Sequence, residues 1–215
     1  MKLYGFWRSS ATWRVRIALA YKGIEYEYVP VHLQRGGGEQ HRPEFRAKNP
    51  MGYVPVLELS VDGRERQIAE SMAILELLEE LHPFPALLPS DAFLRARTRQ
   101  IALLIVAGIQ PLQNTAVRLW VERELGADGA AWTRHWITRG LEAVETLVRE
   151  TAGTYAVGNA VTHADACIVP QLYAARRFGV DTEPYPTLRT VEAACAILPP
   201  FIAAHASSQP DAESA

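Results

Sequence analysis

The chain has 215 residues, of which 48% are hydrophobic and 21% are charged, and its formal net charge is −2. This length and composition are typical of a soluble globular protein with one large domain or two small ones, and they argue against general disorder. There is no basic excess of the kind that favours a nucleic-acid partner.

The cysteines and the apolar stretches indicate in which compartment the protein is expected and whether it is expected to cross a membrane. Cys167 and Cys195 stand among small and aliphatic residues, where buried free thiols are the usual interpretation, and they form neither a CxxC motif nor a metal-ligand cluster. Arg8 interrupts the N-terminal apolar run, and the longest apolar stretch, residues 101–109, is too short to span a bilayer. We therefore expect a reduced, cytoplasmic protein with no metal and no membrane partner.

The N-terminal part has the pattern of a strand, a helix and a second strand. Residues 2–7, with an apolar run from Leu3 to Trp7, read as a short strand, residues 12–22 have helical periodicity, and residues 25–33 alternate as a second strand does. This spacing predicts a right-handed βαβ unit with parallel strands. Ser9 or Ser10 lies where the helix cap is expected, because a serine oxygen can accept an unpaired amide proton. The same amides and the helix dipole attract an anion or a thiolate.

The pattern then continues to residue 81. Residues 36–38 are glycines in a loop with no phosphate-binding motif, and a helical turn is expected at residues 43–47. Residues 53–59 and 65–68 read as two strands joined by the hairpin signal Asp62-Gly63, and residues 72–81 read as a helix. The order βαβ(α)ββα predicts a small α/β layer with a mixed sheet.

Three prolines between residues 82 and 89 indicate a linker, and no convincing strand follows it. Helices are expected at residues 95–124, 130–151, 163–178 and 187–196, and a frayed tail at residues 206–215. The predicted division is an α/β domain at residues 1–82, a linker at 83–90 and an all-helical domain at 91–215. Thr162 and Asp165 have the spacing of a capping box, so we assign them to folding rather than to chemistry.

Five blocks, in this order along the chain, resemble the zeta class of cytosolic glutathione transferases, the family that includes maleylacetoacetate isomerase. The blocks are RSSATWRVRIAL at residues 8–19, NPMGYVP at 49–55, ESMAI at 70–74, GIQPLQN at 108–114 and VDTEPYP at 180–186. The resemblance implies a thioredoxin-like N-terminal domain that binds glutathione, followed by an all-α domain. It also implies a homodimer.

The resemblance assigns roles to residues of both domains. Ser9 or Ser10 would donate a hydrogen bond to the glutathione sulfur and favour its thiolate. Val54, before a cis-Pro55, would pair its backbone with the cysteinyl part of glutathione. Further implied contacts with glutathione or the site lining come from Ala11, Gln40, Glu70, Ser71, Gln110, Asn114, Thr115 and Ala116. Arg8, Arg14 and Arg177 are the candidates for binding the carboxylates of a substrate.

Each role has a structural alternative. Pro55 could be an edge-strand proline, and Glu70-Ser71 could be only a helix start. Arg177 could be a solvated helix residue, and Gln110 with Pro111 could be packing at a helix kink.

Two positions depart from the zeta pattern. Ala11 stands where the family has its signature cysteine, so any contribution of that thiol is absent. Glu70 replaces the zeta glutamine and remains compatible with the γ-glutamyl ammonium.

The resemblance implies an enzyme of tyrosine and phenylalanine catabolism. The reaction would be cis–trans isomerisation of a maleyl compound, most plainly maleylacetoacetate to fumarylacetoacetate, through reversible addition of the glutathione thiolate. Three alternatives stay open at this point. They are a maleylpyruvate isomerase, a broader transferase that acts on α-halo acids, and a non-catalytic glutathione-binding protein.

Overall fold

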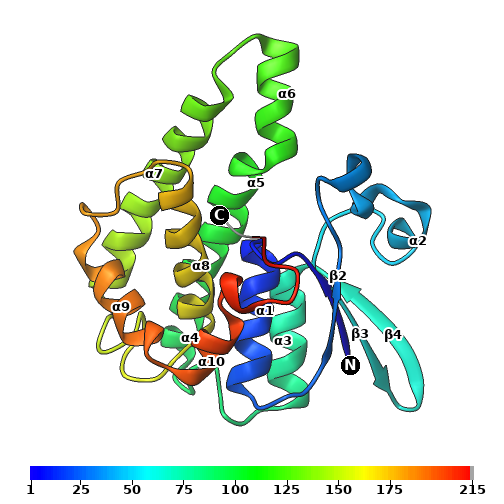
Figure 1. Cartoon of the computed structure of the whole chain (residues 1–215). Coiled ribbons are helices and arrows are strands. Elements are labelled where there is room, and N and C mark those ends of the chain that lie inside the picture. The colour runs from blue at the N-terminus through cyan, green and yellow to red at the C-terminus, as the bar shows by residue number, and fades with distance from the viewer. Residues whose placement is uncertain (214–215) are drawn as a thin grey trace. The chain divides into compact units, whose positions relative to one another are not determined.

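The computed structural model describes residues 1–213, which cluster into two units. The first unit consists of Met1–Ala86 and residues 198–213, and the second is Leu87–Ile197 (Figure 1). This division differs from the predicted one because residues 198–213 cluster with the N-terminal unit and not with the helical one.

The first unit contains a four-stranded sheet in the order β2-β1-β3-β4. Its strands are β1 (Lys2–Gly5), β2 (Glu27–Pro30), β3 (Val56–Val61) and β4 (Arg64–Ala69). β1 and β2 are parallel, whereas β3 runs antiparallel to both β1 and β4. The predicted mixed sheet and βαβ unit are therefore confirmed. Asp62 and Gly63 both have positive φ, 52° and 71°, as the predicted two-residue hairpin requires.

Alternation along the strands separates the two faces of this sheet. Leu3 pairs with Leu57, and both are fully buried. The helices α1 (Ser10–Tyr21) and α3 (Ser71–Leu81) cover one face of the sheet (Figure 1). On the opposite face, Val56 packs with Phe45 of the short helix α2 (Pro43–Arg46). The glycine loop before α2 forms two 3₁₀ turns, η1 (Arg35–Gly37) and η2 (Glu39–His41).

A buried lysine holds the C-terminal end of α1. The Lys22 side chain is fully buried and its Nζ lies 2.7 Å from Glu79 Oε2. The same ammonium donates to the carbonyl oxygens of His82 and Pro85, at 2.7 and 2.9 Å. Because a buried charge is stabilising only when its hydrogen bonds are satisfied, this arrangement ties α1 to the end of α3 and to the proline-rich segment.

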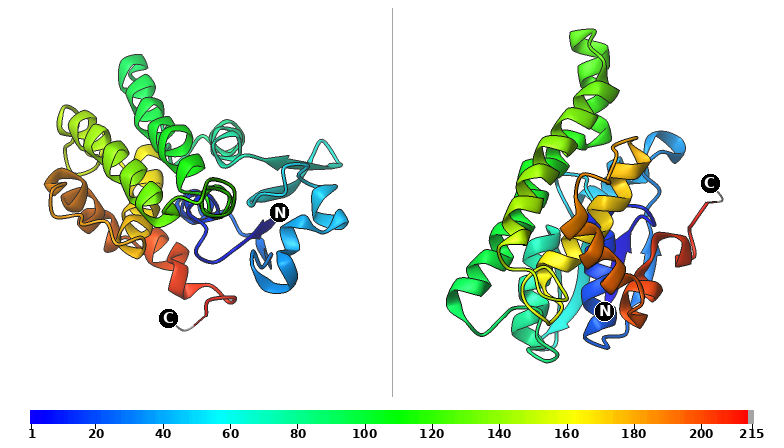
Figure 2. Two further views of the ribbon diagram at one scale, coloured as in Figure 1. Left: turned by 90° about the horizontal axis from the view of Figure 1, so that it is seen from above. Right: turned by 90° about the vertical axis from the view of Figure 1, so that its left-hand side faces the viewer.

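The C-terminal segment of the first unit packs on α1. It contains α10 (Pro199–Ala204) and η4 (Ala206–Ser208), and α10 lies against α1 (Figures 1 and 2). The expectation of a frayed tail is wrong for residues 206–213, because Asp211 accepts hydrogen bonds from Trp7 and Tyr28. Residues 214–215 of the predicted tail lie outside the described residues.

The second unit is helical throughout its main elements. They are α4 (Ala92–Leu103), the π-helical segment η3 (Leu104–Ile109), α5 (Gln110–Gln113), α6 (Thr115–Leu125), α7 (Gly129–Arg149), α8 (His163–Arg177) and α9 (Pro186–Ala196). Gly140 of α7 allows a close helix approach, because a Cβ there would lie 2.2 Å from Ile109. The predicted all-helical character is confirmed.

The single helix predicted at residues 95–124 is corrected to three helices and a π segment. Pro111 has no N–H for the helical ladder, and Asn114 leaves helical geometry with ψ at 136°. The Trp132 indole N–H donates to the Leu112 carbonyl oxygen at 2.9 Å beside this break. The stretch Ala92–Leu125 is long and apolar enough to cross a membrane by length and composition alone. The break at Asn114 interrupts it, and the absence of a membrane partner stays a prediction.

Candidate active site

The turn between β1 and α1 presents Ser9 as the helix cap. Ser9 Oγ accepts the Thr12 N–H at 3.3 Å, and the Ser9 carbonyl oxygen accepts the Trp13 N–H at 2.8 Å. The predicted cap is therefore confirmed, with Ser9 and not Ser10 in that position. Since Ser9 Oγ acts as an acceptor in this bond, its hydroxyl hydrogen remains available to donate to a ligand. Ser10 and Ala11 follow as the first two residues of α1, and both are half-buried.

The glycine loop and the segment before β3 supply two further predicted contacts. Gln40 Nε2 donates to the Leu33 carbonyl oxygen at 3.2 Å. Gln40 Oε1 is buried and has no hydrogen-bond partner among the described residues, so it can accept from a ligand. The Val54–Pro55 peptide bond is cis, as the resemblance implied. Val54 lies before the first residue of β3, so its backbone stays outside the pairing of the sheet.

The start of α3 combines a special backbone with a buttressed serine. Glu70 has φ 65° and ψ 107°, a region that non-glycine residues seldom adopt, and its exposed side chain makes no capping hydrogen bond. Ser71 is the first residue of the helix and is 4% exposed. Its Oγ accepts a hydrogen bond of 2.7 Å from Arg14 Nη1, and Arg14 is fully buried. Having accepted this bond, the Ser71 hydroxyl can donate its own hydrogen to a carboxylate.

This geometry changes the interpretation of Arg14. The sequence offered it as a group that contacts substrate, but its burial and its bond to Ser71 place it behind the α3 helix start. Arg8 is different, because it is only half-buried and stacks 5.6 Å from the Phe6 ring and 5.3 Å from the Trp7 ring. Its Nη2 reaches Gln34 Oε1 at 3.5 Å. A contact between Arg8 and a substrate therefore stays a prediction, whereas Arg14 supports Ser71.

The predicted site residues of the second unit lie on α5, α6 and α8. Gln110 Nε2 donates to Gln171 Oε1 at 3.3 Å, in an amide network that also includes the buried Gln113. Asn114 Oδ1 accepts the Ala116 N–H at 2.9 Å and caps α6, so a structural role accounts for this bond. Thr115 is the first residue of α6, and its place in the site stays a prediction. The bond from Gln110 to Gln171 is likewise a packing contact beside the helix break.

The adjacent arginines at the end of α8 have different surroundings. Arg176 forms an ion pair with Glu192, with Nη1 2.9 Å from Oε2. The exposed Arg177 instead lies over the Phe178 ring at 4.3 Å from its centroid. Arg177, which the resemblance named, is thus exposed and stacked on Phe178, and its contact with a substrate carboxylate stays a prediction.

Comparison with known proteins identifies the family. Residues 3–86 match the model of the glutathione S-transferase N-terminal domain. Over 209 residues, 97% of this chain and 94% of the relative, the chain is 47% identical to maleylacetoacetate isomerase of Rattus norvegicus. A maleylpyruvate isomerase described as a bacterial zeta-class glutathione transferase has 42% identity and a TM-score of 0.92, covering 99% of this chain and all of that one. The chain belongs to the zeta-class glutathione transferase family.

A solved member of this family carries the ligand that the site residues were predicted to hold. Maleylacetoacetate isomerase of Anaeromyxobacter dehalogenans with glutathione bound in its active site has a TM-score of 0.91 and 52% identity, over 99% of this chain and 97% of that one. A second structure of that enzyme contains dicarboxyethyl glutathione and citrate. Family membership confirms the predicted thioredoxin-like fold with its helical second part.

The sequence did not reveal the residues that act behind the site. The Arg14–Ser71 bond joins positions 57 residues apart, and the bond from Trp7 to Asp211 joins positions 204 apart. The only local signal for the first was an arginine inside an otherwise apolar helix face, where burial demands a partner. No signal pointed to Asp211, since a polar residue near a chain end is ordinarily solvated.

Proposed function

We propose that this protein is a glutathione-dependent cis–trans isomerase that converts maleylacetoacetate to fumarylacetoacetate in tyrosine and phenylalanine catabolism. The proposal rests on three polar side-chain groups of the first unit that can each form a further hydrogen bond. The Ser9 hydroxyl, Gln40 Oε1 and the Arg14-supported Ser71 hydroxyl each have hydrogen-bonding capacity left for a ligand. The relatives named above add the identity of that ligand and of the reaction.

The residues present fit glutathione. The Ser71 hydroxyl with the guanidinium of Arg14 behind it suits a carboxylate, and the exposed Glu70 beside it suits an ammonium. Gln40 Oε1 and the backbone of Val54 suit the peptide groups. When bound, glutathione would supply the thiolate nucleophile that adds to and later leaves the substrate double bond.

The chain's own contribution is positional and electrostatic. Ser9, at the positive end of α1, donates its hydroxyl hydrogen to a sulfur anion and so favours the thiolate over the thiol. Arg8 of the first unit and Arg177 of the second are each a candidate guanidinium for a substrate carboxylate. Charge that develops on the substrate is stabilised by the same cations. Ala11 supplies no thiol, so this chemistry rests on the serine.

The direct test measures isomerisation of maleylacetoacetate with and without glutathione. We expect turnover that depends on glutathione and falls at least tenfold in Ser9→Ala, with a smaller effect in Ser10→Ala, because Ser9 is the cap with the available hydroxyl hydrogen. Ser60→Ala, an exposed serine of β3, is the matched control and should retain wild-type rates. Full activity in both Ser9→Ala and Ser10→Ala would remove the serine role.

Substrate choice is tested by a parallel comparison. Maleylpyruvate is the main rival because a relative at 42% identity carries that name. Higher kcat/KM for maleylpyruvate than for maleylacetoacetate would assign the shorter substrate, and turnover of dichloroacetate alone would indicate a broader transferase. Retention on a glutathione resin with no turnover of any of the three would indicate a binding protein.

We further propose a cytoplasmic homodimer. Both cysteines, Cys167 and Cys195, are buried and free, which is compatible with a reducing compartment. Sedimentation equilibrium tests the dimer, and fractionation of the source cells tests the location.

A further inference from the structure

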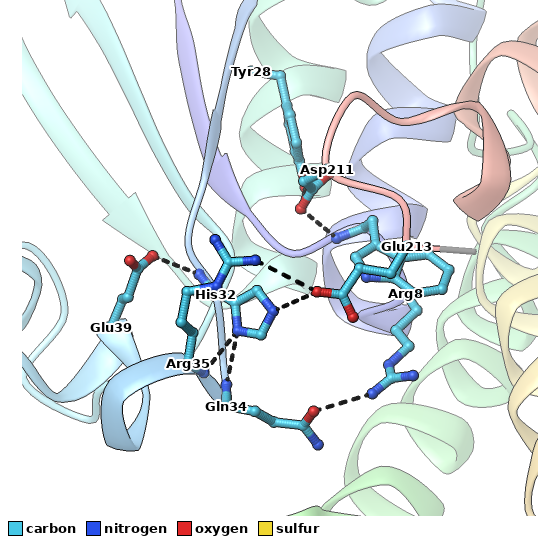
Figure 3. A network of polar contacts seen from close by, with 9 residues as sticks. Arg8, Tyr28, His32, Gln34, Arg35, Glu39, Asp211 and Glu213 are labelled. Atoms are coloured by element: carbon cyan, nitrogen blue, oxygen red, sulfur yellow. Dashed lines mark hydrogen bonds and ion pairs between the residues drawn. The ribbon is translucent and has the colours of Figure 1, made fainter. Parts of the chain in front are cut away.

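Both backbone polar groups of Trp7 are held by side chains from elsewhere in the first unit. Arg16 Nη2 donates to the Trp7 carbonyl oxygen at 2.7 Å. The Trp7 N–H donates to Asp211 Oδ2 at 3.1 Å (Figure 3). One partner comes from the interior of α1 and the other from the C-terminal segment, so Trp7 is clamped between two elements.

Trp7 is a central residue of the turn that orients Ser9. The Ser9 N–H donates to the Phe6 carbonyl oxygen at 3.0 Å, which closes a four-residue turn with Trp7 and Arg8 in its middle. The direction of the Trp7 peptide groups therefore sets the direction in which the chain enters α1. Because Ser9 caps that helix, the clamp also determines where the Ser9 hydroxyl points.

The two clamping side chains are themselves held in place. Arg16 is fully buried, and its Nε donates to the Ala204 carbonyl oxygen of α10 at 3.1 Å. Asp211 Oδ2 accepts the Tyr28 hydroxyl at 3.3 Å, and burial raises the pKa of that phenol. The turn is thus connected to β2 through Tyr28 and to α10 through Arg16, and the C-terminal segment closes the network.

We propose that Asp211 is a positioning residue for the Ser9 hydroxyl, holding the Phe6–Ser9 turn from the C-terminal segment in cooperation with Arg16. This inference rests on the proposed role of Ser9 toward the glutathione sulfur. Asp211 itself bonds to Trp7 and Tyr28 and acts only through the turn.

A second acidic residue of the segment provides an internal control. Glu213 Oε1 lies 2.9 Å from His32 Nε2 and 3.6 Å from Arg35 Nη2, and its side chain is 50% exposed. The His32 contact, with Arg35 and Arg8 nearby, lowers the pKa of Glu213. Glu213 carries the same charge as Asp211, but among the described residues its close contacts are with His32 and Arg35 and not with the backbone of the turn, so Glu213→Gln removes a nearby negative charge and leaves the two Trp7 bonds in place (Figure 3).

The direction in which the thiol pKa of bound glutathione changes distinguishes a positioning role of Asp211 from a mere charge effect. A carboxylate near a thiolate repels it, so removing a merely nearby charge would lower the pKa of the bound glutathione thiol. Loss of a positioning contact has the opposite effect, because a misdirected Ser9 stabilises the thiolate less. The thiol pKa is followed by thiolate absorbance of the glutathione complex, which does not require turnover.

The experiment compares Asp211→Ala, Asp211→Asn and Glu213→Gln. In Asp211→Ala we expect the thiol pKa to rise by about half a unit, kcat/KM at neutral pH to fall about threefold, and Trp7 amide hydrogen exchange to accelerate about tenfold. Asp211→Asn keeps an acceptor oxygen and should recover most of these values. Glu213→Gln should leave the Trp7 exchange rate unchanged.

The outcomes are distinguishable from failure of the proposed function. Exchange of the Trp7 and Leu57 amides is measured on the protein without ligand, and Leu57 in β3 reports general unfolding. Unchanged Trp7 exchange in Asp211→Ala, or a lowered thiol pKa, would overturn the positioning role whatever the substrate. If Asp211→Ala fails to fold, Tyr28→Phe removes one partner of Asp211 and should shift the thiol pKa upward by a smaller amount; no shift there would also contradict the proposal.

Discussion

The N-termini of α8 and α3 show how differently two helix starts can be built in one chain. At α8 the carboxylate of Asp165 accepts the Thr162 N–H at 2.7 Å, the Thr162 hydroxyl at 2.8 Å and the Ala156 N–H at 2.8 Å. At α3 the residue in the cap position, Glu70, makes no capping bond, and Ser71 is supported from behind by Arg14. The carboxylate of Asp165 therefore supplies the hydrogen-bond acceptor at the start of α8, whereas the start of α3 keeps hydrogen-bonding capacity for a ligand.

The charges placed at the two starts have opposite signs. The buried carboxylate of Asp165 already neutralises the positive end of the α8 dipole. The buried guanidinium of Arg14 adds positive charge at the start of α3. An anionic ligand is therefore attracted to α3 and has no place at α8. A helix start can bind an anion when no carboxylate of the chain occupies it and a nearby cation adds to the positive charge of the helix dipole.

Removing the carboxylate at α8 should have the largest effect on stability. In Asp165→Ala the buried N–H groups of Ala156 and Thr162 lose their acceptor, and we expect the free energy of unfolding to fall by about 3 kcal/mol or more. Urea denaturation measures this loss. Asp128→Ala, at the exposed cap of α7, is the matched control and should cost clearly less. Equal losses in the two variants would mean that burial of the carboxylate is irrelevant.

Removing the hydroxyl at α3 should instead affect ligand binding. Ser71→Ala deletes the proposed donor to the glutathione carboxylate, and a hydrogen bond to a charged group contributes about 1.5–3 kcal/mol. We expect the Kd for glutathione to rise at least tenfold by calorimetry. Asp165→Ala, assayed under conditions where it is folded, should retain the wild-type Kd. A Kd that is unchanged in Ser71→Ala would remove the distinction between the two helix starts.

The buried carboxyl of α8 should also give stability a pH dependence. Burial raises the pKa of Asp165 to about 6, above its value in the unfolded chain, so the folded state holds the proton more tightly. The stabilisation that follows is complete below the unfolded pKa and is lost as pH rises through about 6. We expect the stability difference between wild type and Asp165→Ala to shrink by about 1 kcal/mol between pH 5 and 7. A difference that grows over this range would contradict the assignment.

The features that the sequence predicted correctly are those with local signals. The capping box at Thr162 and Asp165 is a spacing of three residues, and the hairpin at Asp62-Gly63 is a two-residue turn preference. The Ser9 cap follows from a serine before a helical pattern. In each case the partners lie within a few residues, so a single sequence contains the information.

The features that the sequence missed depend on contacts between distant segments. Arg14 looked like a substrate ligand because its charge was visible and its burial behind Ser71 was not. Asp211 looked like part of a frayed tail for the same reason. The break at Asn114 is an exception. Pro111 is a local signal for a break in the helix, but the apolar periodicity around it favoured the prediction of one continuous helix.

The smallest expected effect tests whether the support behind Ser71 matters for binding. Arg14→Lys keeps the positive charge but replaces a planar fork by a shorter-reaching ammonium, so the 2.7 Å bond to Ser71 Oγ is weakened. A hydrogen bond of about 1 kcal/mol corresponds to a Kd for glutathione raised about fivefold. Arg66→Lys, an exposed position of β4, is the control.

The double variant Arg14→Lys, Ser71→Ala tests whether Arg14 acts through Ser71. The loss of binding free energy in the double variant should be smaller than the sum of the losses in the two single variants, because the hydroxyl through which Arg14 acts on glutathione is already gone. Fully additive losses would instead show that Arg14 attracts the ligand directly by its charge.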